Sequence, residues 1–159
     1  MTTRAIVVGL IADTHGLLRP GIPGIFSRVD LIVHAGDVGG GVLDALGKIA
    51  PVEAVSGNVD DRSNPMLPRQ RSLPVGVLML HVSHGDELGQ PTPELLLARY
   101  AGDILIYGHT HKPLIFRDDH GRLVVNPGAA GPRRFKSEPA VARLTVVDRT
   151  ADVEFIMLA

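Results

Sequence analysis

Aspartate, histidine and asparagine, three residue types that bind divalent cations, occur in five short clusters along this chain of 159 residues. Aspartate is a hard anionic ligand that can bridge two cations, and neutral imidazole is a good ligand for borderline metals. One Asp-x-His or His-x-His pair is common in polar turns, but five clusters in one chain indicate a shared metal site. The clusters are Asp13-Thr14-His15, Gly36-Asp37, Ser56-Gly57-Asn58, Ser83-His84-Gly85 and Gly108-His109-Thr110-His111.

Each cluster directly follows an apolar run, and the third of these runs is broken only by Glu53. Near-continuous apolar runs are typical of buried strands in an α/β sheet. Ligands of such sheets bind at the carboxyl ends of the strands, so we expect the five clusters to converge. The runs are residues 6–12, 31–35, 52–55, 77–82 and 104–107.

The segments between these runs predict an α/β fold that begins with a βαβαβ unit. Residues 20–29 are expected to hold a short helix, and residues 41–50 place apolar side chains at helical spacing before Pro51. Such a unit favours parallel strands with right-handed crossovers. For residues 1–12 we expect the first strand rather than a signal peptide, because no clear cleavage segment follows Asp13.

The middle of the chain predicts a strand pair and one further helix. Residues 71–75 and 77–82 are expected to pair around Gly76, after a polar loop. A helix is expected to start at Thr92-Pro93-Glu94, since Thr is a good cap and Pro suits the first helical position. Residues 95–98 are expected to form the buried face of that helix.

The last third of the chain predicts four strands separated by short polar turns, which is typical of an antiparallel meander. We find no linker and no internal repeat, so residues 1–159 are expected to form a single domain. The expected strands are residues 114–116, 123–125, 141–147 and 153–157.

The composition limits the classes of function. Hydrophobic residues make up 45% and charged residues 21%, as in soluble globular proteins. The formal net charge of −1 disfavours a nucleic-acid partner, which would require a broad basic face. No apolar run approaches the ~20 residues that span a membrane. The chain has no Cys, so it has no thiolate ligands or disulfides, and we expect a cytoplasmic location. The oligomeric state stays open, with a homo-oligomer among the alternatives.

The five ordered motifs together resemble the calcineurin-like metallophosphoesterases. The match extends from Asp13 to Gly128, and the short chain with Asn126-Pro127-Gly128 is similar to the small prokaryotic YfcE-type phosphodiesterases. This resemblance implies a four-layer αββα sandwich with a dinuclear metal centre at one edge. It also implies a metal-dependent phosphoesterase, most simply a phosphodiesterase, which uses a metal-bridging hydroxide as the nucleophile on a small phosphate ester.

The resemblance also implies a ligand set, in which Asp37 bridges two divalent ions. Mn²⁺ is the preferred ion, with Fe, Zn or Ni as alternatives, because all suit nitrogen and oxygen ligands. The residues implied to be catalytic are His15, Asp37, Asn58 and His84. The implied ligands of the first ion are Asp13, His15, Asp37 and His111, and those of the second are Asp37, Asn58, His84 and His109.

The chain departs from the family pattern beside two of these motifs. Family members that hydrolyse monoesters often have a histidine, a candidate general acid, where this chain has Val59. Because valine cannot donate a proton, we expect phosphodiesters or activated esters rather than ordinary monoesters. Asp60 is expected either to orient a ligand histidine or to be a solvated turn residue, and Asp86 either to contact the site or to be a loop acid.

The other histidines and the basic residues near the C-terminus are not among the implied ligands. We expect His34 and His81 to be structural and His120 to be solvated. Three basic residues follow the Asn-Pro-Gly turn and either bind a phosphate oxygen or form an exposed basic loop. They are Arg133, Arg134 and Lys136.

Other functions remain alternatives. The same fold serves as a non-catalytic protein-interaction scaffold in a retromer subunit, a function that the loss of ligand residues would favour. A phosphomonoesterase or a nuclease is a further alternative, although the low net charge argues against the nuclease.

Overall fold

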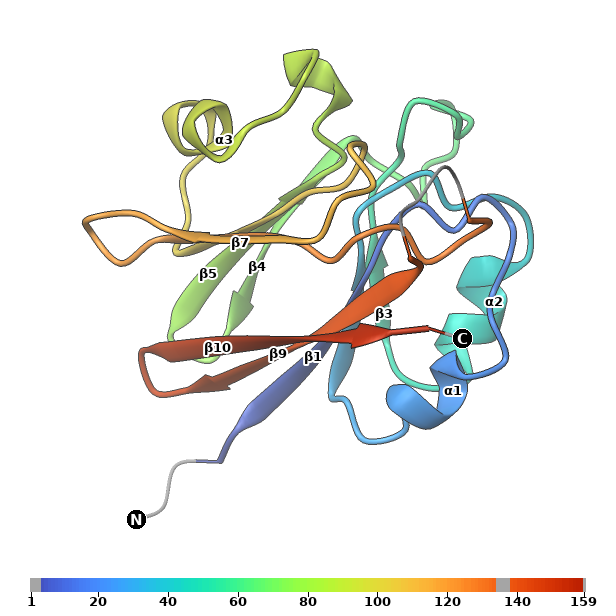
Figure 1. Ribbon diagram of the computed structural model, residues 1–159, viewed down its shortest axis with the longest axis horizontal. Coiled ribbons are helices and arrows are strands. Elements are labelled where there is room, and N and C mark those ends of the chain that lie inside the picture. The colour runs from blue at the N-terminus through green and yellow to red at the C-terminus, as the bar shows by residue number, and fades with distance from the viewer. Residues whose placement is uncertain (1–3, 134–137, 159) are drawn as a thin grey trace.

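The computed structural model describes residues 4–133 and 138–158 and consists of two five-stranded sheets packed face to face (Figure 1). The first sheet has the strand order β10-β9-β1-β2-β3, and the second has the order β4-β5-β6-β8-β7. The strands of the first sheet are β1 (Ile6–Ile11), β2 (Leu31–His34), β3 (Val52–Ala54), β9 (Ala140–Val147) and β10 (Thr150–Met157). Those of the second are β4 (Gln70–Val75), β5 (Leu78–Ser83), β6 (Ile104–Ile106), β7 (Leu114–Arg117) and β8 (Leu123–Asn126).

Helices cover the outer face of each sheet. Helices α1 (Ile22–Ile25) and α2 (Val42–Gly47) pack on the first sheet, while α3 (Pro93–Arg99) packs on the second, near the 3-10 helix η1 (Asp86–Leu88) (Figure 1). The layers therefore run helix, sheet, sheet, helix, which confirms the predicted αββα sandwich.

The predicted βαβαβ unit is confirmed. Strand β1 pairs with β2 in parallel, and β2 pairs with β3 in parallel. In the second sheet, β5, β6 and β8 are parallel to one another. Because parallel strands end at a common edge, the loops that follow β1, β2 and β3, and likewise those after β5 and β6, are brought together.

The predicted antiparallel meander of the last third is wrong. Strands β7 and β8 form a hairpin in the second sheet, where β8 also pairs in parallel with β6. Strands β9 and β10 form a hairpin in the first sheet, where β9 pairs antiparallel with β1. Local turn signals identify neighbouring strand pairs but not the sheet they join, because sheet membership depends on which apolar face each hairpin buries.

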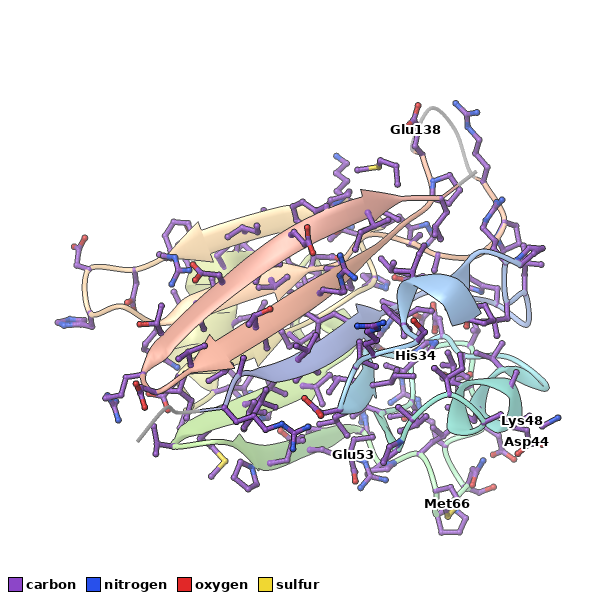
Figure 2. All side chains as sticks on the ribbon, turned by 90° about the horizontal axis from the view of Figure 1, so that it is seen from below. His34, Asp44, Lys48, Glu53, Met66 and Glu138 are labelled. Carbon is purple, nitrogen blue, oxygen red and sulfur yellow. The ribbon has the colours of Figure 1, made fainter. Side chains whose placement is uncertain are left out.

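The main hydrophobic core lies between the two sheets. It contains Val8 and Leu10 of β1, Leu80 and Val82 of β5, and Leu144 of β9, all fully buried. Charged side chains such as Asp44 and Lys48 stand at the periphery of the molecule (Figure 2).

Two smaller clusters lie under the helices and explain why the strands have continuous apolar sequences. Ile11 and Ile32 face outward and pack against Phe26 and Leu46. On the second sheet, Leu105 and other outward side chains pack beneath α3. Strands buried on both faces need apolar residues at consecutive positions.

Helix α3 starts as predicted but does not bury its predicted face. The Thr92 hydroxyl accepts a hydrogen bond of 3.2 Å from the Leu95 N–H, which caps the helix. Leu96 is fully buried, whereas Leu95 is 45% exposed. Successive residues of a helix are rotated by about 100°, so residues 95–98 cannot share one face.

No helix within residues 4–133 and 138–158 has the length and apolar character needed to cross a membrane.

Candidate metal centre

The loops after β1 and β2 continue the strand pairing beyond the sheet. The Asp13 N–H donates to the Gly36 carbonyl and the His15 N–H donates to the Asp37 carbonyl, each at 3.0 Å. These backbone bonds hold the Asp13-to-His15 segment against Asp37, at the edge of the sheet where the sequence predicts convergence.

The backbone at the predicted ligands is unusual. Six non-glycine residues of the described chain have positive φ, and one of them, Asp148, lies in the β9–β10 turn. Such conformations cost roughly 1–3 kcal/mol each and tend to cluster at functional sites. The other five are all predicted ligands, namely Asp13, His15, Asp37, His109 and His111.

Two buried carboxylates stand among the histidines. His84 Nε2 lies 3.2 Å from Asp37 Oδ2 and 3.7 Å from Asp13 Oδ1. His111 Nε2 lies 3.4 Å from Asp13 Oδ1, and His15 Nε2 lies 3.7 Å from Asp37 Oδ2. Each carboxylate therefore contacts two imidazoles.

Five of the seven predicted ligands supply atoms to two compact groups. Asp13, His15 and His111 form one group, and Asp13, Asp37 and His84 form the other, with the ligand atoms of each within 4.8 Å of one another. Asp13 belongs to both groups. Asp37 also connects them, because its Oδ2 lies near His15 as well as His84.

Three atoms of these groups are buried without a hydrogen-bond partner: Asp13 Oδ1, His15 Nε2 and His84 Nε2. Asp37 Oδ2 is near His84 Nε2, but the two atoms are not directed as a hydrogen bond requires. Leaving a buried donor or acceptor unpaired costs about 1–3 kcal/mol. Bound cations would satisfy all three atoms, so the residues present fit a metal.

Charge and hydrogen bonding prepare His84 for such a role. Its Nδ1 donates to the Ala35 carbonyl at 2.8 Å, which leaves the Nε2 lone pair of the neutral ring facing the carboxylates. Burial opposes the charged imidazolium, but the contact with Asp37 and the charge of Asp13 outweigh it and raise the pKa of His84 to about 9. A cation would take the place of that proton.

Asp37 is held ionised by the same contact. Burial raises the pKa of its carboxyl, but His84 and the Val59 N–H outweigh this effect and lower the pKa to about 2. The Val59 N–H donates to Asp37 Oδ1 at 3.1 Å. The carboxylate is therefore ionised at neutral pH, as a metal ligand must be.

The close approach of backbone to carboxylate requires glycine at two positions. A Cβ on Gly57 would lie 2.0 Å from Asp37 Oδ1, and a Cβ on Gly108 would lie 2.9 Å from Asp13 Oδ2. Both separations are shorter than van der Waals contact permits, so these glycines make room for the two carboxylates.

The remaining two predicted ligands lie beside the groups. The His109 ring is edge-on to the His84 ring with centroids 5.2 Å apart, and the His109 N–H donates to Asp13 Oδ2 at 3.2 Å. Asn58 is exposed and directly precedes Val59, whose N–H contacts Asp37.

Asp60 has neither of its predicted roles. Its carboxylate accepts hydrogen bonds from the Val38, Gly39 and Gly57 N–H groups at distances of 2.8–3.2 Å. It therefore joins the loop after β2 to the loop after β3. The sequence shows an acid at this position, but two of its backbone partners, Val38 and Gly39, lie more than twenty residues away and leave no local signal.

His34 is a structural residue, as predicted. It is fully buried, its Nδ1 accepts from the Gly36 N–H at 3.1 Å, and its Nε2 lies 3.0 Å from Thr14 Oγ1. Thr14 donates to the Val38 carbonyl, so it accepts from His34. The ring is therefore neutral, and burial lowers the pKa of His34 to about 4.

The other two histidines also lie where expected. His81 is buried and stacks on the Tyr100 ring with centroids 4.1 Å apart. His120 is exposed in the β7–β8 turn.

Asn126 positions the loop that carries His109 and His111. Its amide nitrogen donates to the Gly108 carbonyl at 3.2 Å and to Thr110 Oγ1 at 3.0 Å. The Asn126-Pro127-Gly128 motif was part of the resemblance, but this positioning role could not be read from it.

The loop acid Asp86 begins η1 and forms an ion pair of 2.8 Å with Arg62. The pair joins two loops that border the centre. Of the three basic residues after the Asn-Pro-Gly turn, Arg133 is exposed, while Arg134 and Lys136 lie outside the described residues.

A cavity of about 400 Å³ adjoins the centre, and we call it the His109 pocket. It is lined by residues 90–93, Tyr107, His109, Thr110, Lys112 and Leu114.

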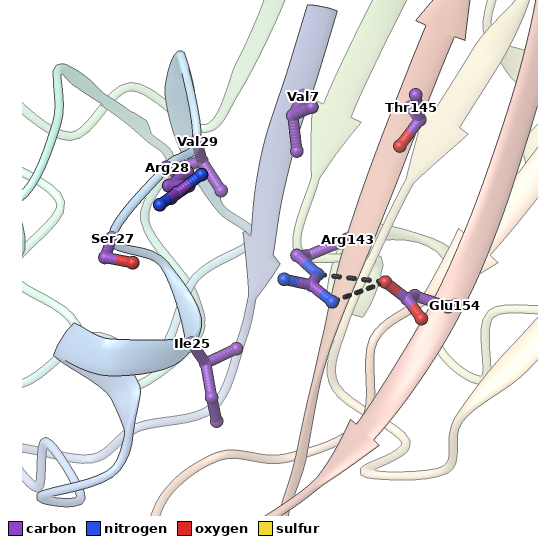
Figure 3. Close-up of a pocket in the computed structure, with 8 residues that line it drawn as sticks. All are labelled: Val7, Ile25, Ser27, Arg28, Val29, Arg143, Thr145 and Glu154. Carbon is purple, nitrogen blue, oxygen red and sulfur yellow. Dashed lines mark hydrogen bonds and ion pairs between the residues drawn. The ribbon is translucent and has the colours of Figure 1, made fainter.

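A second cavity, of about 220 Å³, lies between α1 and strands β1, β9 and β10 (Figure 3). Arg143 and Glu154 form an ion pair there, and Val7, near the beginning of β1, also lines the cavity. Asp13 follows the opposite end of β1, so this cavity is separate from the metal-binding residues.

Comparison with known proteins finds relatives in sequence and in fold. A protein of Methanothermobacter thermautotrophicus named "Probable metallophosphoesterase" is 32% identical over 95% of this chain and 92% of its own. A structure described as a novel archaeal phosphodiesterase superposes with a TM-score of 0.74 at 22% identity, covering 96% of this chain and all of its own. Vps29 of Entamoeba histolytica complexed with Zn²⁺ gives a TM-score of 0.75 at 23% identity, covering 96% and 99%.

The two structural matches, at 22% and 23% identity, show similarity of fold. The protein of Methanothermobacter thermautotrophicus has a higher sequence identity of 32%. The family model described as the calcineurin-like phosphoesterase superfamily domain matches residues 6–149, which include every cluster that converges at the sheet edges. We conclude that this chain is a member of the calcineurin-like phosphoesterase superfamily.

Proposed function

We propose that this protein is a metal-dependent phosphodiesterase with a dinuclear centre. One ion would be held by Asp13, His15, Asp37 and His111. The other would be held by Asp37, Asn58, His84 and His109, so that Asp37 is shared.

The observation that carries this proposal is the set of buried, unpartnered ligand atoms. Asp13 Oδ1, His15 Nε2 and His84 Nε2 are each buried without a hydrogen-bond partner, and they belong to two overlapping ligand groups. Overlapping groups that share a carboxylate suit two cations better than one. The proximity of Asp37 Oδ2 to both His15 and His84 supports a bridging role for Asp37.

Two bound divalent cations would supply positive charge to a phosphoryl group and lower the pKa of water toward neutrality. The residues of the chain have separate tasks around that chemistry. His84 is oriented by the Ala35 carbonyl, and Asp37 is fixed by the Val59 N–H. Asp60 holds the loop that carries Asn58. A site preorganised in this way loses little free energy to reorganisation during reaction.

The proposal of a diester substrate depends on Val59. This residue is 58% exposed and offers only its N–H, which is already bound to Asp37. A side chain that can protonate a leaving group is therefore absent at the position where monoesterases of this family often have histidine. Diesters with good leaving groups need less protonation of the leaving group. The fold similarity to an archaeal phosphodiesterase is consistent with this choice.

The test is turnover of bis(p-nitrophenyl) phosphate by protein reconstituted with Mn²⁺, compared with p-nitrophenyl phosphate. We expect the diester to be preferred and a chelator to abolish turnover. His84→Ala should lower kcat by at least about a hundredfold, since it removes a ligand from the centre. The matched control His120→Ala changes an exposed histidine and should retain the rate. An unchanged rate in His84→Ala would overturn the proposed ligand set.

We propose Mn²⁺ as the ion, with Fe, Zn and Ni as alternatives that suit the same nitrogen and oxygen donors. A metal panel in the same assay distinguishes them. The relative that was crystallised with Zn²⁺ shows that this fold binds zinc in that protein.

The second candidate function is a protein-interaction scaffold on the same fold. The similarity to Vps29, a vacuolar protein sorting protein, favours it. A scaffold would bind metal without hydrolysing any of a panel of phosphodiesters. The retention of all seven predicted ligand residues favours the enzyme.

A further inference from the structure

A third cavity, of about 190 Å³, is lined by residues of both sheets at the edge opposite to the metal-binding loops. We call it the arginine pocket, after Arg117, Arg122 and Arg149 in its lining. The β7–β8 and β9–β10 turns border it, and both lie on the left of Figure 1, away from the loops that follow β1 and β2. The pocket is therefore not part of the candidate metal centre.

Strand β5 separates the arginine pocket from that centre. Leu78 begins β5 and lines the pocket, whereas His84 directly follows the last residue of β5. Because β5 has six residues and a strand rises about 3.3 Å per residue, the two positions are roughly 20 Å apart. A small ligand in the pocket would therefore not touch a phosphate held at the centre.

Positive charge is in excess in the arginine pocket. The chain as a whole has a formal net charge of −1, but the three arginines of the pocket are accompanied by one acidic residue of the lining, Asp103. The formal surplus is two positive charges. A bound anion would be attracted by this surplus and would reduce the repulsion between the arginines.

Arg149 has a guanidinium group that is free to bind a ligand. It is exposed in the β9–β10 turn, and within residues 4–133 and 138–158 it has no hydrogen bond or ion pair. A guanidinium group presents five N–H donors in a planar fork that matches two oxygens of a phosphate. Arg149 is therefore the residue of the pocket that is most available to an anion.

Arg117 extends from the facing sheet and is only partly engaged. Its guanidinium group donates to the Ala151 carbonyl of β10, which holds it beside the pocket. Its ion pair with Asp152 is loose, at 3.8 Å, and Asp152 is 78% exposed. Solvent screens such a pair, so it competes weakly with a ligand. Arg117 and Arg149 thus offer donors from the two sides of one cavity.

The remaining two charges of the pocket are bound to the backbone. The Arg122 guanidinium group donates to three carbonyls at the end of α3 and in the loop after it. Asp103 Oδ2 accepts from the Met79 N–H at 2.8 Å. These bonds fix both side chains, and the Met79 N–H offsets part of the negative charge of Asp103.

The size of the pocket suits a phosphate group. A volume of about 190 Å³ corresponds to roughly six water molecules at about 30 Å³ each, which is too small for a whole nucleotide. A tetrahedral dianion can accept from guanidinium groups on two sides at once, and its two charges match the surplus of the lining. Charge-assisted bonds from arginine to phosphate are among the strongest hydrogen bonds in proteins.

We propose that the arginine pocket binds a phosphate dianion, either as the free ion or as the terminal group of a small phosphate ester. Arg149 and Arg117 would contact its oxygens from the two sheets. This site is separate from the proposed phosphodiesterase centre.

The test is an NMR titration of ¹⁵N-labelled protein loaded with Zn²⁺, which is diamagnetic and leaves amide signals visible. Sodium phosphate at pH 8.0 is added while sodium chloride keeps the ionic strength constant. We expect saturable shifts concentrated at the amides of Ile104, Gly121 and Arg149. An unsaturated response at these amides would overturn the inference, as would shifts confined to the loops that carry the predicted metal ligands.

Variants then locate the binding. Arg149→Ala should raise Kd for phosphate at least about tenfold, because it removes charge-assisted bonds at an exposed turn position. Arg149→Lys keeps the charge but loses the planar fork, so it should raise Kd by a smaller factor. The matched control Arg28→Ala removes the same charge at another exposed position and should keep Kd. An unchanged Kd in Arg149→Ala would contradict the assignment.

Two further ligands define the chemistry of the site. Methyl phosphate presents a dianion on a carbon group, and acetate carries a single charge. Binding of methyl phosphate at least as tight as that of inorganic phosphate would assign the pocket to the phosphate group of an ester, and weaker binding would assign it to the free ion. Acetate that binds as tightly as phosphate would overturn the choice of a dianion. The titration needs no turnover, so its result is independent of whether the metal centre hydrolyses phosphodiesters.

Discussion

His84 Nε2 and Asp37 Oδ2 lie 3.2 Å apart, with the His84 side chain fully buried and that of Asp37 only 4% exposed. Without a cation, the negative charge of Asp37 favours the protonated His84 ring, in agreement with the pKa of His84, which is raised to about 9. With a cation, both atoms become ligands. The pair therefore connects metal binding to the stability of the fold.

The first prediction concerns that connection. A metal concentration of 100 times Kd should stabilise the protein by about 2.7 kcal/mol, which corresponds to a rise in Tm of roughly 5–10 °C for a chain of this size. Asp37→Asn should remove most of this rise, because it replaces a charged ligand with a neutral one. Differential scanning fluorimetry with and without Mn²⁺ measures it. Asp44→Asn, an exposed change on α2, is the control and should keep the rise in Tm. If Mn²⁺ raised the Tm of Asp37→Asn as much as that of the original protein, the role of Asp37 would be contradicted.

The second prediction concerns the missing proton donor. Val59→His introduces an imidazole at an exposed position without removing the N–H that binds Asp37. General acid catalysis contributes about 10²–10⁴-fold where the leaving group is poor. We therefore expect a larger gain on phenyl esters than on p-nitrophenyl esters, measured as kcat for a series of leaving groups. Val59→Gln, which is polar but cannot act as the acid, should show no such trend.

The third prediction concerns pH and His34. The pKa of this buried ring is lowered to about 4, so the unfolded chain takes up a proton below pH 6.5 while the folded protein does not until about pH 4. Above pH 6.5, the titration of His34 therefore does not change the free energy of unfolding. As pH falls from 6.5 toward 4, the free energy of unfolding decreases by an amount on the order of 3 kcal/mol.

Urea unfolding at pH 7.5 and pH 5.0 measures this loss. His34→Gln removes the titrating group and should have a weaker dependence of unfolding free energy on pH than the original protein. An equal dependence in both proteins would show that His34 does not titrate in this way.

The fourth prediction concerns Asp60, which joins two loops through three backbone N–H groups. Asp60→Asn replaces an acceptor oxygen with an NH₂ group that cannot accept from them. The expected cost is about 1–3 kcal/mol of unfolding free energy, together with weaker metal binding. The neighbouring Asp61→Asn is the matched control, because Asp61 is exposed and, among the described residues, its carboxylate accepts hydrogen bonds from Ser63 alone. If both variants lost a similar amount of unfolding free energy, the role of Asp60 in joining the loops after β2 and β3 would be contradicted.

Much of the fold could be predicted from apolar periodicity. Strands buried on both faces produce uninterrupted runs such as residues 104–107, and these end close to where the sequence indicates. The error in the last third has a different origin. The hairpins of β7–β8 and β9–β10 look alike locally, but they join different sheets, and the choice depends on long-range burial that no short segment encodes.

The candidate site was predictable in residue types but not in supporting contacts. Clusters such as Asp13-Thr14-His15 carry the ligand types in the sequence itself. The bonds from Asp60 to Val38 and from Asn126 to Thr110 could not be inferred, since they join residues whose proximity exists only in the folded chain. The positive φ of Asp37 and His109 was equally hidden, because most Asp and His residues have negative φ even though both types are enriched among the exceptions.

The most direct test of a two-metal phosphodiesterase is a stoichiometric titration of metal-free protein with Mn²⁺, in which bound metal and turnover of bis(p-nitrophenyl) phosphate are measured together. The predicted result is binding of two ions per chain, with turnover that rises until the second site is filled. Binding of two ions without turnover, or full turnover with a single bound ion, would contradict the account.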